Sequence, residues 1–115
     1  MGDVKAVLPP GTVSLGSLEK VPLGQGFCFL VADREVAVFR QRDGSVFATQ
    51  NRCPHKQGPL SEGVLGAGKV ICPLHAHVFD CRTGEGPKPQ ECVKVYPVRI
   101  VDGQIVLTIG AGPAC

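Results

Sequence analysis

Long hydrophobic runs are missing from this 115-residue sequence: no apolar stretch approaches the roughly 18 residues of a membrane span. The N-terminus has no charged segment leading into an apolar one, so we expect no secretory signal. Basic runs with interleaved aromatic residues are missing too, and the net charge is only +2, which argues against nucleic acid as a partner. We therefore expect a cytoplasmic protein that binds neither a membrane nor nucleic acid.

Motifs of a substrate site are missing as well. The sequence contains no glycine fingerprint for a dinucleotide, no phosphate-binding loop and no facial triad for mononuclear iron. We therefore expect no substrate site in this chain, and a role as one component of a larger system.

Glycine and proline are abundant, with 15 and 10 residues, whereas segments with a helical period are few. This composition favours many turns and an all-β fold. Because a chain of this length usually builds one hydrophobic core, residues 1–115 are predicted to form a single domain.

Runs of β-forming residues predict a three-stranded meander, then a region of short strands, then a final hairpin. The meander strands are expected at 26–32, 35–40 and 45–50, with turns at Asp33-Arg34 and Asp43-Gly44. Short strands are expected at 69–72 and 77–81, with a glycine-rich connector at 63–69. The hairpin is expected at 93–101 and 104–109, and it should pair with the N-terminal strand at 12–18.

Two short Cys/His motifs lie between the meander and the hairpin. They are Cys53-x-His55 and Cys72-x-x-His75, separated by sixteen residues, and each cysteine is followed by a proline. Two thiolates and two imidazoles suit zinc or an iron–sulfur centre rather than a cation that prefers oxygen ligands. The spacing alone leaves both metals open, although C-x-H is unusual for structural zinc.

This pattern resembles the Rieske [2Fe–2S] motif, in which two histidines replace two cysteines on one iron. The resemblance implies that Cys53 and Cys72 hold one iron, and that His55 and His75 hold the other, nearer solvent. It also implies an antiparallel β-sandwich or barrel with a small inserted cluster-binding subdomain, here about residues 51–82. The implied cofactor is one [2Fe–2S] cluster, and the implied function is one-electron transfer.

Departures from the high-potential members of that family indicate a low reduction potential. Gly58 and Leu74 stand where those members carry a disulfide. His77 and Phe79 stand where they carry a serine and a tyrosine that hydrogen-bond to sulfurs of the centre. Hydrogen bonds to the sulfurs stabilise the reduced centre, so a centre with fewer such donors is harder to reduce. We therefore predict a reduction potential near the low end of roughly −150 to +300 mV.

Two electron-transfer roles are compatible with the resemblance. Residues 36–40, 50–60 and 95–98 are similar to the small subunit of assimilatory NAD(P)H-dependent nitrite reductase, which pairs with a large subunit carrying FAD, [4Fe–4S] and sirohaem. The alternative is the ferredoxin that serves a ring-hydroxylating dioxygenase and its reductase. We favour the nitrite reductase role here, and a zinc-bound structural or interaction module is the hypothesis from another class.

The remaining cysteines and one histidine have no assigned role. Cys28 lies in an apolar strand and is expected to be a buried free thiol. Cys81 and Cys92 bracket a loop, but no disulfide is expected between them in a reducing cytoplasm. Cys115 is expected to be an exposed tail thiol, and His77 to be solvated or near the sulfurs, with proton coupling as the alternative.

Overall fold

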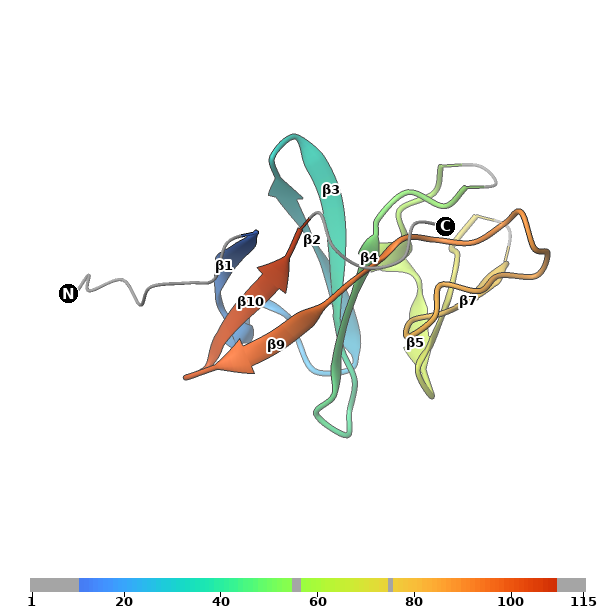
Figure 1. Ribbon diagram of the computed structural model, residues 1–115. Helices are drawn as coiled ribbons and strands as arrows, with labels where there is room; N and C mark the ends of the chain where they lie inside the picture. The colour runs from blue at the N-terminus through green and yellow to red at the C-terminus, as the bar shows by residue number, and fades with distance from the viewer. Residues whose placement is uncertain (1–10, 55–56, 75, 110–115) are drawn as a thin grey trace.

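The computed structural model describes residues 11–54, 57–74 and 76–109, and this part of the chain forms three antiparallel sheets (Figure 1). The first sheet has the order β1 (Thr12–Ser17), β10 (Gln104–Thr108), β9 (Val98–Val101). The second has the order β2 (Gln25–Val31), β3 (Arg34–Arg40), β4 (Val46–Gln50), β8 (Val95–Tyr96). The third has the order β5 (Val64–Gly66), β6 (Lys69–Ile71), β7 (Val78–Asp80). Two 3₁₀ turns, η1 (Leu18–Lys20) and η2 (Leu60–Glu62), precede β2 and β5, so the predicted all-β fold is confirmed.

Strand β3 is the element on which both hydrophobic cores are built. Its residues Val36 and Val38 belong to the core shared with the first sheet, whereas Ala37 and Phe39 belong to the core shared with the third. All four side chains are buried. Because successive side chains of a strand point to opposite faces, an uninterrupted apolar run fits a strand that is covered on both sides. Figure 1 accordingly shows the second sheet between the other two.

The core between the second and third sheets reaches the predicted centre. It contains Leu60, Val70 and Phe79 together with Cys53 and Cys72. Burial of a Leu, Val or Phe side chain contributes about 1.5–3 kcal/mol to folding. The two cysteines are therefore packed into the hydrophobic core rather than carried on exposed loops.

The N-terminal strand and the final hairpin pair as predicted. Thr12 faces Thr108 across the β1–β10 ladder, and β9 continues into β10 across Asp102 and Gly103, which have φ values of 51° and 76°. A two-residue hairpin turn with both φ angles positive matches the twist of the flanking strands.

The single strand predicted at 93–101 is wrong, because the chain changes sheet at Pro97. Before it, β8 pairs with β4, with Tyr96 opposite Ala48; after it, β9 pairs with β10, with Val98 opposite Leu107. Proline has no N–H to donate to a ladder, so it interrupts a strand. This break lets one segment join the first and second sheets.

The connector predicted at 63–69 is also wrong, since it contains β5. This strand pairs with β6 across the turn Ala67-Gly68, whose φ values are 52° and 75°. The glycines of the segment therefore shape a tight hairpin of the third sheet.

The β2–β3 hairpin differs from the prediction in two details. Its turn lies at Ala32 and Asp33, with φ values of 50° and 65°, one residue earlier than predicted, because Val31 pairs with Arg34. Cys28 is a free thiol as predicted, but it is exposed, because β2 is an edge strand of its sheet.

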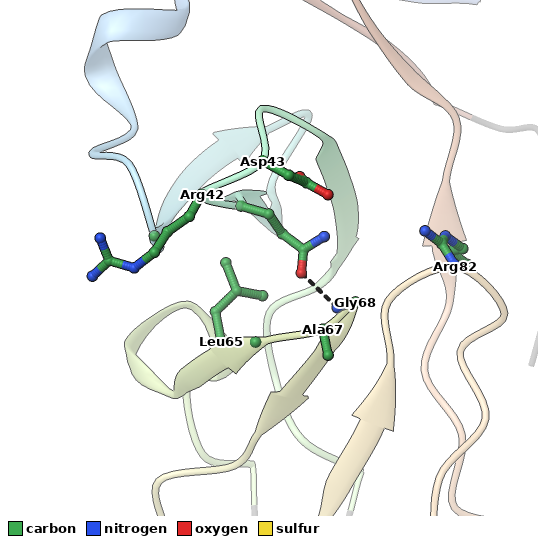
Figure 2. Close-up of a pocket in the computed structure, with 9 residues that line it drawn as sticks. Arg42, Asp43, Leu65, Ala67, Gly68 and Arg82 are labelled. Carbon is green, nitrogen blue, oxygen red and sulfur yellow. Dashed lines mark hydrogen bonds between the residues drawn. The ribbon is translucent and has the colours of Figure 1, made fainter.

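A cleft of about 390 Å³ separates the β3–β4 turn from the β5–β6 turn (Figure 2). Arg42 and Arg82 stand at opposite sides of it, as Figure 2 shows, and the buried Gln41, which also lines it, accepts a hydrogen bond from the Gly68 N–H. The Gly68 end of β6 is the end away from Cys72, so this cleft is not the predicted centre. Within the described residues, no helix is long and apolar enough to cross a membrane.

Candidate metal centre

Two loops with the same backbone geometry carry the two predicted Cys/His motifs. In the first, Cys53 donates its N–H to the Gly58 carbonyl at 2.8 Å and accepts at its own carbonyl from the Gln57 N–H at 2.7 Å. In the second, Cys72 makes the equivalent bonds with His77 at 2.8 Å and Ala76 at 3.0 Å. The residue four positions after each cysteine has a positive φ, 60° at Gln57 and 56° at Ala76. Each cysteine is therefore held at the base of a short closed turn.

The two loops lie against each other at Gly58. A Cβ on this glycine would stand 3.1 Å from the Cys72 Sγ and 2.9 Å from the Leu74 Cγ, closer than real Cβ contacts normally are. Gly58 and Leu74 are the two positions at which the resemblance places a disulfide in high-potential members. In this chain the two residues touch without a covalent bond, so the loops are held together here by packing and not by a disulfide.

The two predicted cysteine ligands are both buried. Cys53 is 0% exposed and Cys72 is 1% exposed. Cys72 is a free thiol, so no disulfide joins the two. His55 and His75 lie outside the described residues, and among the described residues no group of three or more Cys, His, Asp or Glu side chains could hold a metal ion.

A third buried cysteine in the same core has different chemistry. Burial raises the pKa of the Cys81 thiol to about 12, with a further contribution from the charge of Asp80. Cys81 therefore stays protonated at neutral pH, as a small apolar core residue does. It is a free thiol, whereas Cys92 is disulfide-bonded, so the two are not joined to each other.

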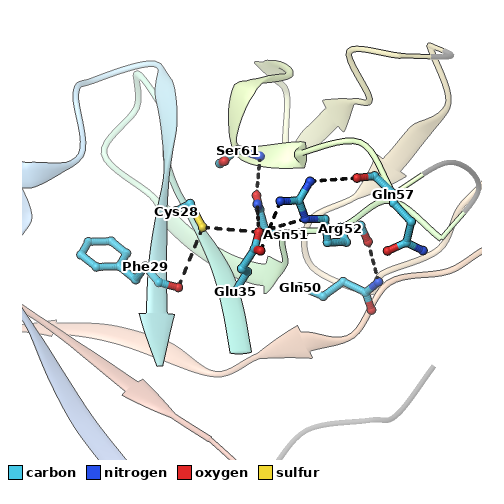
Figure 3. A network of polar contacts seen from close by, with 8 residues as sticks. All are labelled: Cys28, Phe29, Glu35, Gln50, Asn51, Arg52, Gln57 and Ser61. Atoms are coloured by element: carbon cyan, nitrogen blue, oxygen red, sulfur yellow. Dashed lines mark hydrogen bonds and ion pairs between the residues drawn. The ribbon is translucent and has the colours of Figure 1, made fainter. Parts of the chain in front are cut away.

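A network of polar contacts supports the first loop from β3 (Figure 3). The Glu35 carboxylate accepts hydrogen bonds from Asn51 Nδ2 at 2.9 Å and from Arg52 Nη2 at 3.2 Å, and Arg52 Nε forms an ion pair with Glu35 Oε1 at 3.0 Å. Arg52 also donates from Nη1 to the Gln57 carbonyl at 3.1 Å. The bonds from Asn51 and then Arg52 lower the pKa of the Glu35 carboxyl from its ordinary value.

Sequence reasoning missed this network. Glu35 and Arg52 are 17 positions apart, and neither belongs to a Cys/His motif. The β3–β4 ladder, in which Val36 faces Gln50, is what brings the two side chains together. A prediction of which β3 residue faces which β4 residue would have revealed the pair.

The two residues that replace the serine and tyrosine donors are both near the core. Phe79 is fully buried between the second and third sheets. His77 is half-buried, with its Nδ1 3.5 Å from Oε1 of Glu91, a residue of the loop after β7. Of the two alternatives predicted for His77, a solvated position or one near the sulfurs, the solvated one holds only in part, because Glu91 lies against one nitrogen of the ring.

A model of the Rieske-like [2Fe-2S] domain family matches residues 12–108, nearly all of the described chain. The chain belongs to this family. Membership identifies one [2Fe–2S] cluster as the cofactor, and it decides in favour of iron–sulfur over zinc. The buried cysteine pair on two adjoining loops fits that group, because thiolates are its sulfur ligands in Rieske centres.

Two curated relatives of this Rieske-like domain are ferredoxins. The anthranilate 1,2-dioxygenase ferredoxin subunit of Burkholderia cepacia is 39% identical over 99 residues, covering 84% of this chain and 90% of the relative. The biphenyl dioxygenase ferredoxin subunit of Pseudomonas sp. strain KKS102 is 43% identical over 94 residues, covering 79% and 84%.

A solved structure provides a third comparison. It is a proposed NADH-dependent nitrite reductase small subunit from Mycobacterium tuberculosis, with a TM-score of 0.79 and 29% identity, covering 87% of this chain and 96% of that one. The Rieske fold and the resemblance stated from the sequence are thus confirmed. The protein is a Rieske-type electron carrier.

Proposed function

We propose that this Rieske-like protein is the ferredoxin component that delivers single electrons to a ring-hydroxylating dioxygenase. The observation that carries the proposal is the identity of 39% and 43% with two dioxygenase ferredoxin subunits, over most of their length. The identity with the nitrite reductase small subunit is lower, at 29%. The role favoured from the sequence therefore takes second place.

We propose the ligands as the sequence predicts them: Cys53 and Cys72 hold one iron, and His55 and His75 hold the other. The burial of both cysteines and the contact of their loops support this assignment. When bound, the [2Fe–2S] group supplies a site that accepts and releases one electron. Residues 51–82 form the cluster-binding subdomain in this proposal.

Around the proposed cluster, the chain supplies a buried side at the two cysteines and a solvent-exposed side at the second loop. Cys53 and Cys72 are buried in the core, which closes the sulfur side to water, whereas Leu74 in the second loop is 56% exposed. An exposed apolar residue beside the ligands suits a transient contact with a partner protein. The proposed partners are a reductase that supplies electrons and an oxygenase that receives them.

The ligand assignment is tested with the single variants Cys72→Ser and His75→Ala. Each should lose the visible spectrum of the oxidised centre and the electron paramagnetic resonance signal of the reduced one. The matched control is Cys28→Ser, because Cys28 is an exposed thiol of β2 and should leave both signals unchanged. An intact centre with an unchanged spectrum in either ligand variant would refute the assignment.

The choice of partner is tested by reoxidation of the reduced protein. We expect rapid reoxidation when a ring-hydroxylating oxygenase of the same organism is added, with one electron transferred per molecule and product formed from the aromatic substrate. The fold similarity at a TM-score of 0.79 makes a sirohaem-containing nitrite reductase large subunit the second candidate acceptor. Reoxidation by that subunit, with nitrite consumed and no transfer to the oxygenase, would overturn the dioxygenase proposal.

A further inference from the structure

The two loops of the centre are alike in backbone but differ in how they are anchored. The second loop is the turn between β6 and β7, and these strands pair directly, with Ile71 opposite Val78. The first loop follows β4 and precedes η2, and its two ends meet in a single bridge between Arg52 and Pro59. A ladder therefore holds the second loop, whereas the first has no comparable pair of strands in the described chain.

The Arg52 side chain makes up for the missing ladder. Its guanidinium binds both carboxylate oxygens of Glu35 and still has Nη1 available to donate to the Gln57 carbonyl. Gln57 is the left-handed residue that turns the first loop back toward Cys53. A planar guanidinium that contacts both oxygens of a carboxylate fixes an orientation that a lysine would not.

The charges of this pair also lie close to the centre. Arg52 directly precedes Cys53 and is charged at any accessible pH. A positive charge nearby stabilises the reduced, more negative state, and the Glu35 carboxylate opposes that effect. At 48% and 37% exposure, the pair contributes little to global stability, so its effect should be local.

We propose that Arg52 and Glu35 form a clamp that positions the first cluster loop and balances the charge next to the centre. Arg52 and Glu35 are positioning residues in this account, since neither is a proposed ligand. The inference rests on the proposed ligand set, because it requires Cys53 to bind the cluster.

The test is the reduction potential of four cluster-loaded variants. Arg52→Gln leaves the Glu35 charge unbalanced and should lower the potential, whereas Glu35→Gln leaves the Arg52 charge unbalanced and should raise it. The double variant should return near the wild-type value. Loosening of the loop alone would shift both single variants in the same direction, so opposite signs separate charge from structure.

Arg52→Lys separates positioning from charge. It keeps the positive charge but cannot contact both Glu35 oxygens and the Gln57 carbonyl at once, so the potential should stay near that of the wild type while the cluster is lost several-fold faster during incubation with a chelator. The matched control is Lys69→Gln, which breaks the Lys69–Asp80 ion pair on the third sheet, at the end of β6 away from Cys72. This control should lose its cluster at the wild-type rate.

Ionic strength gives an independent readout. The two opposite shifts should shrink between about 0.01 M and 1 M salt, as the screening length falls from about 30 to 3 Å. Shifts of the same sign in both single variants, or an Arg52→Lys variant that keeps its cluster as long as the wild type, would overturn the clamp. A wild-type protein without a [2Fe–2S] spectrum would instead overturn the proposed function, so the two failures are distinguishable.

Discussion

Replacing Asn51 with alanine tests how the base of the first cluster loop is closed. Asn51 is 2% exposed, and its Oδ1 accepts a hydrogen bond from the Ser61 N–H at 2.9 Å. Its Nδ2 donates to Glu35, and its backbone carbonyl accepts from the Leu60 N–H at 2.7 Å. Since the residue before η2 supplies no side-chain cap, Asn51 caps this turn from across the loop.

The expected loss of stability follows from which polar groups lose their hydrogen-bond partner. Alanine leaves the buried Ser61 N–H without its acceptor, and an unsatisfied buried donor costs about 1–3 kcal/mol. Glu35 is partly exposed and keeps Arg52, so losing the second bond adds little. We therefore expect the free energy of unfolding to fall by about 1–3 kcal/mol, which lowers the melting temperature by roughly 4 °C per kcal/mol.

The assay is thermal unfolding of the cluster-loaded protein followed by circular dichroism. Asn51→Asp is the matched control: it keeps an acceptor for the Ser61 N–H but sets a second carboxylate against Glu35. It should be destabilised at neutral pH and recover when combined with Glu35→Gln, which restores a donor opposite an acceptor. A change of less than about 0.5 kcal/mol in Asn51→Ala, the range of ordinary surface substitutions, would refute the capping role.

Three further predictions follow from single contacts. Gly63→Ala should destabilise the protein strongly, because its Cβ would lie 2.1 Å from the Ile71 carbonyl oxygen, whereas Gly66→Ala meets nothing within 4 Å and should be neutral in the same denaturation assay. Because the pKa of Glu35 is lowered on folding, its stabilising effect, which is small for so exposed a group, is present above its ordinary value of 4.5 and is lost as the pH falls through the folded value. The small difference in melting temperature between wild type and Glu35→Gln at neutral pH should therefore disappear in acid, and a difference that stays constant with pH would contradict this. The wild-type potential should lie near the low end of roughly −150 to +300 mV, and Phe79→Tyr, which adds a hydroxyl in the core shared with both cysteines, should raise it in a redox titration; a wild-type midpoint well above zero would show that the missing donors do not control it.

The choice between two partners illustrates what sequence motifs leave open. The Cys/His motifs resemble those of the whole Rieske family, to which both candidate roles belong, so the resemblance alone cannot separate them. Identity over most of the chain shifted the preference toward a dioxygenase ferredoxin.

The sequence by itself determined the kind of cofactor, through its two Cys/His motifs, and most of the β-strands. The spacing of Cys53 and Cys72, the hairpin at Asp102-Gly103 and the lack of bridging cysteines at Gly58 and Leu74 are local features, which neighbouring residues encode directly. The all-β fold followed from turn residues and β-forming runs for the same reason.

Only the tertiary structure decided which distant side chains meet. The change of sheet at Pro97 depends on two different pairing partners, and the exposure of Cys28 depends on β2 being an edge strand. The contact of Glu35 with Arg52 depends on the register of β3 against β4. Strand register is a property of two segments at once, so no local pattern in either segment reveals it.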